Sequence, residues 1–270
     1  MAEKADDIKV LIDFLSCDLQ IADEVFDIFD NLDGAQIYIS GAKHCERFLF
    51  KKGAREDRMT LIAHADTIYD KKGRTYKSTP KTFSTDGAPI FPEKYPDRID
   101  QTIVREGSIF KGANPDFGIG ADDRAGCAIL WLMRNSGHNV LLVDGEEDFL
   151  RGTRYLMREH NEIFDEIHKS RCSIEFDFPE KDKLGYYDTL TSDSFKTYIT
   201  QKTGYRENPN TQITDIGILC VEMCAVNLSV GYYNHHTKDE YLDIGAWLKT
   251  LRIIRKISSE EIPKFILSQK

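Results

Sequence analysis

The sequence predicts an α/β protein, built as a three-layer α/β/α sandwich around a mostly parallel sheet. Apolar runs of strand length alternate along the chain with segments of helical period, which is the pattern of strands connected by helices. The chain of 270 residues is 41% hydrophobic, which is enough for a substantial core and excludes a disordered protein. No repeat or linker divides the chain, so we expect residues 1–270 to form one domain.

The N-terminal part predicts two helices followed by strands. Apolar residues recur at helical spacing within Asp6–Leu32, and turn residues follow them at Asn31–Gly34. The period then shortens to that of strands, which we expect at Gln36–Ser40, Arg47–Lys51 and Met59–Ala63. The last of these is an apolar run, as a strand buried on both faces should be.

Residues 67–121 are expected to be an excursion of hairpins and loop over the scaffold, because this part lacks a sustained helical period. The alternation then resumes. Helices are expected at Ala125–Asn135, Phe149–His160 and Tyr241–Ile257. Strands are expected at Asn139–Val143, Cys172–Phe178 and Val226–Val230, with a polar loop at Tyr205–Gln212.

Charge and composition exclude several functions. The chain has 36 basic and 45 acidic residues and no basic stripe, so we expect no nucleic-acid partner. No stretch reaches the roughly 20 apolar residues of a membrane span, and we expect no membrane partner. The acidic start of the chain does not have the pattern of a secretory signal, which favours a cytoplasmic protein. The six cysteines are therefore expected to be reduced and buried.

Histidines and acidic residues recur where the apolar strands end. His64 and Asp66 follow one strand at alternating positions, so their side chains are expected on the same side. A carboxylate beside a histidine fixes its tautomer and makes it a better metal ligand. The pattern is also compatible with a solvated histidine at the edge of a loop.

Two adjacent carboxylates, Asp122 and Asp123, precede the next helix. They are compatible with a simple helix cap, because aspartate is favoured at helix N-termini. The surrounding glycines, Gly118, Gly120 and Gly126, are more than a cap requires. They predict a sharp bend or a close approach of the backbone to another group.

A further acidic cluster, Asp144-Gly-Glu-Glu-Asp148, follows the strand that ends at Val143. These acids repel one another, so either the turn is solvated or a cation neutralises it. With a cation nearby, one glutamate is able to bind it while its neighbour carries protons. Glu175 and Asp177 share a face of the next strand, where an unpaired carboxylate is costly to bury, so we expect a partner for one of them.

The last pattern is the histidine pair His235-His236 between the final strand and helix, which is also compatible with side chains that merely decorate a helix entry. Taken together, these residues stand at successive strand ends, and open α/β sheets bind ligands beyond the carboxyl ends of their strands. Imidazole and carboxylate ligands without cysteine suit zinc, manganese or cobalt. Their number suits two metal ions that share one carboxylate.

In this order the motifs "LIAHADT", "IGADDRAG", "DGEED", "IEFDF" and "NHHTKDEY" resemble the co-catalytic di-zinc exopeptidase superfamily, which includes peptidase T, the bacterial di-zinc aminopeptidases, the tetrahedral aminopeptidases and the glutamate carboxypeptidases. The resemblance extends from Thr60 to Tyr241. It implies a phosphorylase/hydrolase-like zinc peptidase core with two divalent ions.

The resemblance also implies a role for each residue. His64 and Asp177 would bind the first metal, Glu147 and His236 the second, and Asp122 would bridge both, with a cis peptide bond after it. His235 is the less favoured alternative to His236. Asp66 would orient His64, and Glu146 would be the general base.

Two departures from the family are visible. The stretch between Asp177 and His236 is too short for the lid domain of the larger relatives, so the chain resembles the catalytic core alone. Phe149 stands where the family pattern "EE-x-G" has glycine, which puts the shape of that loop in doubt. Substrate contacts are not assigned by the sequence; those considered are Asp215, Tyr69, Tyr187, Tyr205, Arg124 and Arg151.

The function expected from these patterns is a metal-dependent exopeptidase, an aminopeptidase or dipeptidase that acts on a peptide or small amide. Two alternatives stay open. The same core also suits a hydrolase or cyclase of a non-peptide amide, or a metal-free binding homologue. The sequence does not indicate the oligomeric state or the side-chain preference.

Overall fold

The computed structural model describes residues 2–40, 46–69, 82–83, 89–90, 98–99, 101–187, 189–209 and 213–267. Its helices are α1 Ala2–Leu15, α2 Asp23–Asp30, α3 Ala121–Leu132, α4 Arg151–Glu159, α5 Asn161–His168, α6 Asp193–Thr203, α7 Asp215–Leu219 and α8 Ile244–Ser259. Its strands are β1 Ala35–Ile39, β2 Arg47–Lys51, β3 Thr60–His64, β4 Thr82–Phe83, β5 Pro89–Ile90, β6 Ile103–Glu106, β7 Ile109–Gly112, β8 Asn139–Val143, β9 Ser173–Phe178, β10 Lys183–Gly185, β11 Arg206–Glu207, β12 Ala225–Ser229, β13 Tyr232–Tyr233 and β14 Tyr241–Asp243.

The main sheet has eight strands in the order β1-β2-β8-β3-β9-β12-β10-β11. Its four central strands, β8, β3, β9 and β12, are all parallel to one another. Antiparallel strands flank them, with β2 pairing to β8 on one side and β10 to β12 on the other. The predicted mostly parallel sheet is confirmed, and the carboxyl ends of the central strands meet at one edge.

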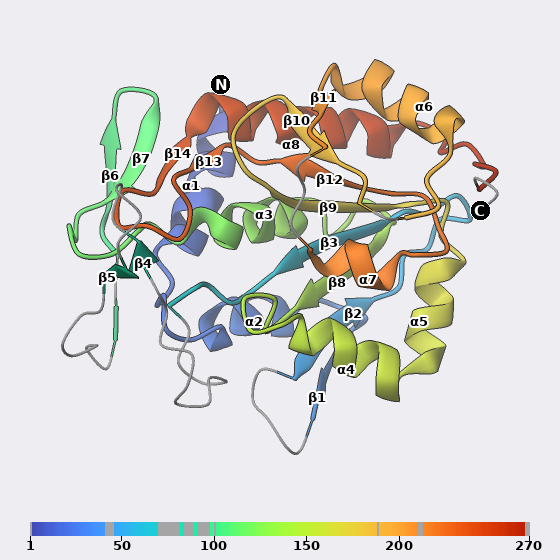
Figure 1. Cartoon of the computed structure of the whole chain (residues 1–270), viewed down its shortest axis with the longest axis horizontal. Coiled ribbons are helices and arrows are strands. Elements are labelled where there is room, and N and C mark those ends of the chain that lie inside the picture. Colours follow the sequence, from blue (N-terminus) through green and yellow to red (C-terminus); the bar gives the residue numbers. More distant parts are fainter. Residues whose placement is uncertain are drawn as a thin grey trace.

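Helices cover both faces of this sheet, as Figure 1 shows, with α1, α3 and α8 on one side and α4 and α5 on the other. The alternation along β3 follows this division: Leu61 and Ala63 join the core under α3, whereas Ile62 joins the core under α4 and α5. All five residues of β3 are buried, which confirms the prediction of a strand covered on both faces. The predicted three-layer arrangement is therefore correct.

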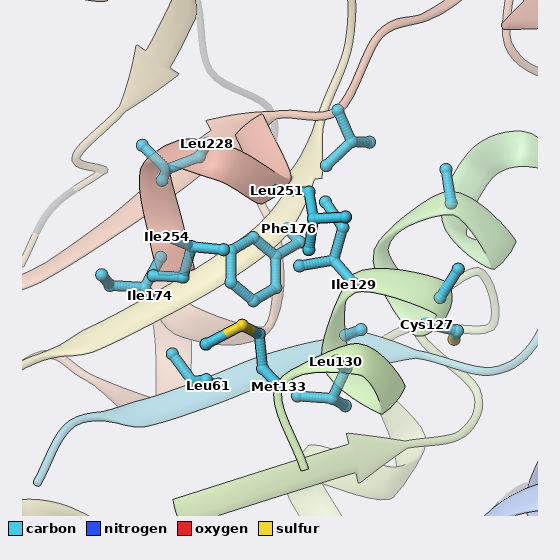
Figure 2. Close-up of a cluster of buried hydrophobic side chains, with 14 of the residues drawn as sticks. Leu61, Cys127, Ile129, Leu130, Met133, Ile174, Phe176, Leu228, Leu251 and Ile254 are labelled. Carbon is cyan, nitrogen blue, oxygen red and sulfur yellow. The ribbon is translucent and has the colours of Figure 1, made fainter. Parts of the chain in front are cut away.

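The larger core is packed around Phe176, the residue that precedes Asp177 on β9. Figure 2 shows its ring between Leu61 of β3, Ile129 of α3 and the helix α8. The ring is fully buried, and burying a phenylalanine stabilises a fold by roughly 1.5–3 kcal/mol. This packing fixes the end of β9 against β3 and α3, which all contribute polar residues at the same edge.

A second sheet, of four antiparallel strands in the order β13-β14-β7-β6, lies beside this edge. Its β6–β7 hairpin belongs to the predicted excursion of residues 67–121, and the pair β4–β5 is a second hairpin there. The rest of the excursion, residues 70–81, 84–88, 91–97 and 100, is outside the described residues. The sheet joins this excursion to the segment that follows β12.

The prediction of a helix over Tyr241–Ile257 is wrong at its start. Tyr241–Asp243 pairs with β7 as β14, and α8 begins only at Ile244. Asp243 caps the helix, because its Oδ1 accepts the backbone N–H groups of Gly245 and Ala246 at 2.8 and 3.1 Å. Pairing with a strand more than 100 residues away is not visible in local periodicity.

Several elements were not predicted, namely α5, α6, α7 and β10. The predicted loop at Tyr205–Gln212 contains the short strand β11, and its last three residues are outside the described part. The five described cysteines are free and buried, as predicted; Cys45 is outside the described residues. Among the helices that the structure describes, none is long and apolar enough to cross a membrane.

Candidate metal centre

Three neighbouring strands bring the predicted residues to one edge of the sheet. β3 ends at His64, β8 is followed by Glu146 and Glu147, and Asp177 is the penultimate residue of β9. Asp122 comes from the start of α3, and His236 comes from the loop between β13 and β14. All of these residues except His64 line one cavity of about 430 Å³.

His64 is oriented by Asp66. Its Nδ1 lies 3.1 Å from the backbone oxygen of Asp66 and 3.4 Å from Oδ1 of the same residue. An N–H at Nδ1 therefore donates to Asp66 and leaves the Nε2 lone pair to face Asp122 Oδ1 at 3.2 Å and Asp177 Oδ1 at 3.5 Å. His64 is 1% exposed and its Nε2 has no hydrogen-bond partner among the described residues, so the lone pair of this nitrogen is available to bind an ion.

His236 occupies the equivalent place on the other side of Asp122. Its Nε2 lies 2.7 Å from Glu147 Oε1 and 3.1 Å from Asp122 Oδ2. Burial lowers the pKa of His236, but the charges of Glu147 and Asp122 outweigh it and raise the pKa to about 12. The neighbouring His235 lines the cavity and meets the His236 ring edge-on, without contacting these carboxylates.

The two oxygens of Asp122 thus face two different histidines, Oδ1 facing His64 and Oδ2 facing His236. Ligand atoms about 2.0–2.2 Å from a tetrahedral zinc ion lie about 3.4 Å apart. The nitrogen–oxygen distances around Asp122 are close to this value. The ligand atoms of Asp122, Glu147 and His236 also lie within 4.8 Å of one another.

Asp123 has a different role from its neighbour, which the sequence did not indicate. Its Oδ1 accepts the backbone N–H of Gly126 at 2.9 Å, and its Oδ2 accepts the backbone N–H of His64 at 3.2 Å. It therefore joins the start of α3 to the end of β3. The peptide bond between Asp122 and Asp123 is cis, as the resemblance predicted.

The acidic turn after β8 is held by Asp66. The Oδ1 and Oδ2 atoms of this carboxylate accept the backbone N–H groups of Glu146 and Glu147 at 3.1 and 3.0 Å. The same side chain therefore orients His64 and the two glutamates. Phe149, which stands where the family pattern has glycine, adopts a φ of +64°, a left-handed conformation that glycine favours.

The glycines around Asp122 are needed for close approach, as predicted. A Cβ at Gly118 would lie 2.6 Å from Oε2 of Glu240, and Gly126 would clash with the backbone oxygen of Phe176. Glu240 accepts the backbone N–H groups of Gly120 and Asp122 at 2.7 and 3.0 Å. This residue fixes the turn that presents Asp122, and its function was not recognised from the sequence.

Two hydroxyl groups hold Asp177. Tyr232 donates to its Oδ1 at 3.1 Å, and Thr214 lies 3.2 Å from its Oδ2. Thr214 Oγ1 also lies 3.0 Å from Oε1 of the buried Glu175. The predicted partner for one of this pair of acids is therefore Thr214. Burial raises the pKa of Glu175, and the charges of Asp177 and Asp215 raise it further.

Glu146 lines the cavity, and within the described residues its carboxylate accepts no side-chain or backbone hydrogen bond. Burial raises its pKa, and Asp177 and Glu147 raise it further, whereas His64 opposes them. A carboxylate with a raised pKa is suited to accepting and returning a proton.

Of the substrate contacts that the sequence left open, only Tyr187 lines the cavity. Tyr69 and Tyr205 are buried in the scaffold, and Arg124 donates to the backbone oxygens of Asp18 and Ile21. Arg151 pairs with Asp148 at 2.5 Å. Asp215 is buried and accepts a hydrogen bond from Thr153 at 2.6 Å.

The donor set fits divalent metal ions. His64 Nε2 is buried without a partner, and imidazole and carboxylate groups converge on two points on either side of Asp122. Four carboxylates line the cavity, and a cation bound there would relieve their repulsion. Zinc, manganese and cobalt all accept these ligands.

No protein-family model matches the sequence, and no curated protein is similar to it in sequence. Solved structures share its fold. The aminopeptidase PepT from Bacillus cereus superposes with a TM-score of 0.62 at 10% identity, over 95% of this chain and 99% of that one. The chain shares its fold with this aminopeptidase.

Two further solved structures have the same fold. A tripeptidase from Staphylococcus aureus superposes with a TM-score of 0.60 at 12% identity, over 95% of this chain and 99% of the other. The TET1 peptidase of Pyrococcus horikoshii, described as forming a tetrahedron or a large octahedral shell, has a TM-score of 0.59 at 12% identity, over 94% and 99% of the two chains. The similarity therefore extends over almost the whole aminopeptidase-like fold.

Proposed function

We propose that this chain is a metal-dependent exopeptidase, an aminopeptidase or dipeptidase, that uses two divalent ions. The observation that carries the proposal is the position of Asp122 between His64 and His236, with one oxygen toward each. The fold shared with the aminopeptidase PepT and the tripeptidase supports a peptide as substrate. Zinc is the first choice of metal, with manganese and cobalt as alternatives.

Five residues would hold the ions. His64 and Asp177 would bind the first, Glu147 and His236 would bind the second, and Asp122 would contribute one oxygen to each. Asp66 would keep His64 in the tautomer that leaves Nε2 available, because its own oxygens already contact Nδ1. The hydroxyls of Thr214 and Tyr232 would hold Asp177 in place.

Two bound divalent ions would supply Lewis acidity, lowering the pKa of a water molecule and polarising the scissile carbonyl. Glu146 takes the proton from the attacking water and returns it to the leaving amine. Its raised pKa suits this exchange. Asp66 keeps Glu146 facing the cavity by accepting its backbone N–H.

We also propose that residues 1–270 act as one catalytic domain without a lid. Between Asp177 and His236 the described residues form β10, α6, β11, α7, β12 and β13. Of these, β10, β11 and β12 extend the main sheet, and α6 and α7 pack on elements of the same scaffold. The cavity would therefore be open to a short peptide without a second domain closing over it.

The test combines metal analysis with a substrate screen. The purified protein is stripped of metal, reconstituted with zinc, manganese or cobalt, and assayed on unblocked dipeptides and tripeptides, peptides blocked at either end, and N-acyl amino acids. We expect two ions per chain and cleavage of peptides with a free amino end. Preference for N-acyl amino acids would favour a non-peptide amidase, and absence of bound metal would contradict the proposal.

A further inference from the structure

Phe149 stands in an unfavourable backbone conformation with its ring in solvent. Its φ is +64°, a region that L side chains other than Asn and Asp rarely adopt, and 76% of the residue is exposed. An exposed phenylalanine gains little from the hydrophobic effect, and glycine would adopt this φ without a steric penalty. Neither packing nor backbone geometry explains an aromatic residue here.

The adjacent residue makes the contrast clear. Leu150 is also left-handed, with a φ of +57°, but only 3% of it is exposed. Burial of the Leu150 side chain therefore offsets the steric penalty of its backbone conformation. The exposed side chain of Phe149 provides no such compensation. The same loop carries two strained residues, of which only one contributes to the core.

The backbone around Phe149 is fixed on both sides. The N–H of Leu150 donates to the oxygen of Glu146 at 3.1 Å, and the N–H of Arg151 donates to the oxygen of Gly145 at 2.8 Å. The carbonyl of Phe149 itself accepts the Nε of Arg154 at 2.9 Å. Phe149 therefore belongs to a hydrogen-bonded loop whose other end carries Glu146 and Glu147.

The ring lines the same cavity as the candidate metal ligands. Ile213, which is 64% exposed, lines it as well. The other large apolar residues that are exposed within the described part of the chain, Ile39, Val104, Val221, Ile266 and Leu267, are outside this lining. Two exposed apolar residues therefore line the cavity that also contains the candidate metal ligands.

We propose that Phe149 is a specificity-determining residue, whose ring and the side chain of Ile213 bind an apolar side chain of the substrate. This inference rests on the proposed peptidase function and adds its substrate class: short peptides with a leucine-like or aromatic side chain next to the metal centre. The apolar surface of the ring, which stays in water in the free protein, would then be buried when the substrate binds, and this burial would contribute to affinity.

The test measures binding apart from turnover. Glu146→Gln protein loaded with zinc is titrated calorimetrically with Leu-Gly-Gly, Gly-Leu-Gly, Gly-Gly-Leu and Gly-Gly-Gly. We expect at least one leucine peptide to bind about tenfold more tightly than triglycine. When Phe149→Gly is combined with Glu146→Gln, the ratio of the triglycine to the leucine-peptide dissociation constant should fall below three. Phe149→Asn should have the same effect, because asparagine also tolerates a positive φ. Ile266→Gly, which removes an equally exposed side chain elsewhere, should keep it.

The melting temperature distinguishes a role of Phe149 in substrate binding from a role in stabilising the fold. Phe149→Gly should melt at the same temperature as the parent or higher, because glycine removes the steric penalty at φ +64°. In the parent with Glu146 intact, the substitution should lower kcat/KM for leucine peptides through KM. An unchanged binding ratio, a lower melting temperature, or a change in oligomeric mass with unchanged preference would overturn the proposal. If zinc-loaded parent cleaves no peptide yet Phe149→Gly removes the leucine preference, the proposed peptidase function fails and the role of Phe149 stands.

Discussion

Glu240 accepts the backbone N–H of Asp122 at 3.0 Å, although 118 residues separate the two in the chain. The other oxygen of Glu240 accepts the N–H of Gly120 at 2.7 Å. The turn that presents Asp122 to both histidines is therefore held by a buried side chain from the segment after β13. No hydrogen bond local to α3 replaces these two, since Gly120 is the N-cap residue and has no side chain.

Replacing this side chain leaves both N–H groups buried without a partner. Each unsatisfied group costs about 1–3 kcal/mol, so Glu240→Ala should lower the free energy of unfolding by about 2–4 kcal/mol. Urea denaturation of the metal-free protein measures this effect. Asp239→Ala removes an exposed carboxylate next to it and should change stability by less than about 0.5 kcal/mol. Equal effects of the two substitutions would refute the structural role of Glu240.

Asp122→Ala should abolish tight metal binding, because one carboxylate serves both halves of the centre. We expect fewer than half of the ions bound by the parent, measured by elemental analysis after gel filtration. Asp116→Ala, which removes an exposed carboxylate from the preceding loop, should keep the metal content of the parent. Full occupancy in Asp122→Ala would contradict the shared position of this residue.

Glu146→Gln should keep the ions and lose turnover. General base catalysis contributes about 10²–10⁴-fold, and an amide cannot accept the proton. The expected result is a fall in kcat of that size at unchanged metal content, measured on whichever peptide the parent cleaves best. The exposed surface residue Glu159 provides the matched control, and Glu159→Gln should be as active as the parent. Retained activity in Glu146→Gln would assign the base to another residue.

Thr214→Val should lower the metal affinity of the proposed site that contains Asp177. The hydroxyl contacts Oδ2 of Asp177 and Oε1 of Glu175, and the methyl group that replaces it donates to neither. Loss of such supporting hydrogen bonds lowers metal affinity by about 10–100-fold. Competition with a chromophoric chelator measures the zinc dissociation constants. Thr214→Ser restores the hydroxyl and should restore affinity; a valine variant with parental affinity would show that Thr214 does not position Asp177.

Stability should decrease in mild acid through His138, which lies in the loop between α3 and β8, at the opposite end of β8 from Glu146 and Glu147. Burial lowers the pKa of His138 to about 4, and the charge of Arg55 adds to the effect. Its Nδ1 accepts the backbone N–H of Met59 at 3.1 Å, which requires a neutral nitrogen. The unfolded chain, with a pKa of about 6.5, therefore binds more protons below that value.

The contribution of this histidine is complete above pH 6.5 and is lost as the pH falls toward 4, by at most about 1.4 kcal/mol per pH unit. Unfolding free energies at pH 7, 6 and 5 measure the slope. His138→Asn keeps an acceptor near the Nδ1 position and does not titrate, so its stability should depend less steeply on pH. Parallel slopes for the two proteins would refute the assignment to His138.

The sequence predicted the fold well wherever a strand or helix is recognisable from its own residues. The apolar run before His64 and the segment Asn139–Val143 are central strands, because burial on both faces requires continuous apolar character. The start of α8 was missed for a different reason. Tyr241–Asp243 continues the helical spacing, but pairing with β7 overrides it.

In the candidate site, too, local sequence patterns were recognised and contacts between distant residues were not. Its charged residues follow strand ends and are recognisable from that pattern, and the structure brings His64, Asp66, Asp122, Glu146, Glu147, Asp177 and His236 together. The groups that hold them, such as Glu240 and Thr214, were not recognised, because their partners are distant in the chain and their side chains are ordinary for a loop. Their metal-binding and catalytic roles remain predictions that the experiments above test.

His236 and Glu240 are carried by the segment that links β13 to β14, in the four-stranded sheet, whereas His64, Glu147 and Asp177 belong to the edge of the eight-stranded one. Asp122 connects these two parts of the site, because it contacts His64 from the eight-stranded sheet and Glu240 from the segment between β13 and β14. His236 also faces Glu147 across this boundary at 2.7 Å, so any change in how the two sheets pack would alter the spacing of the proposed ligands.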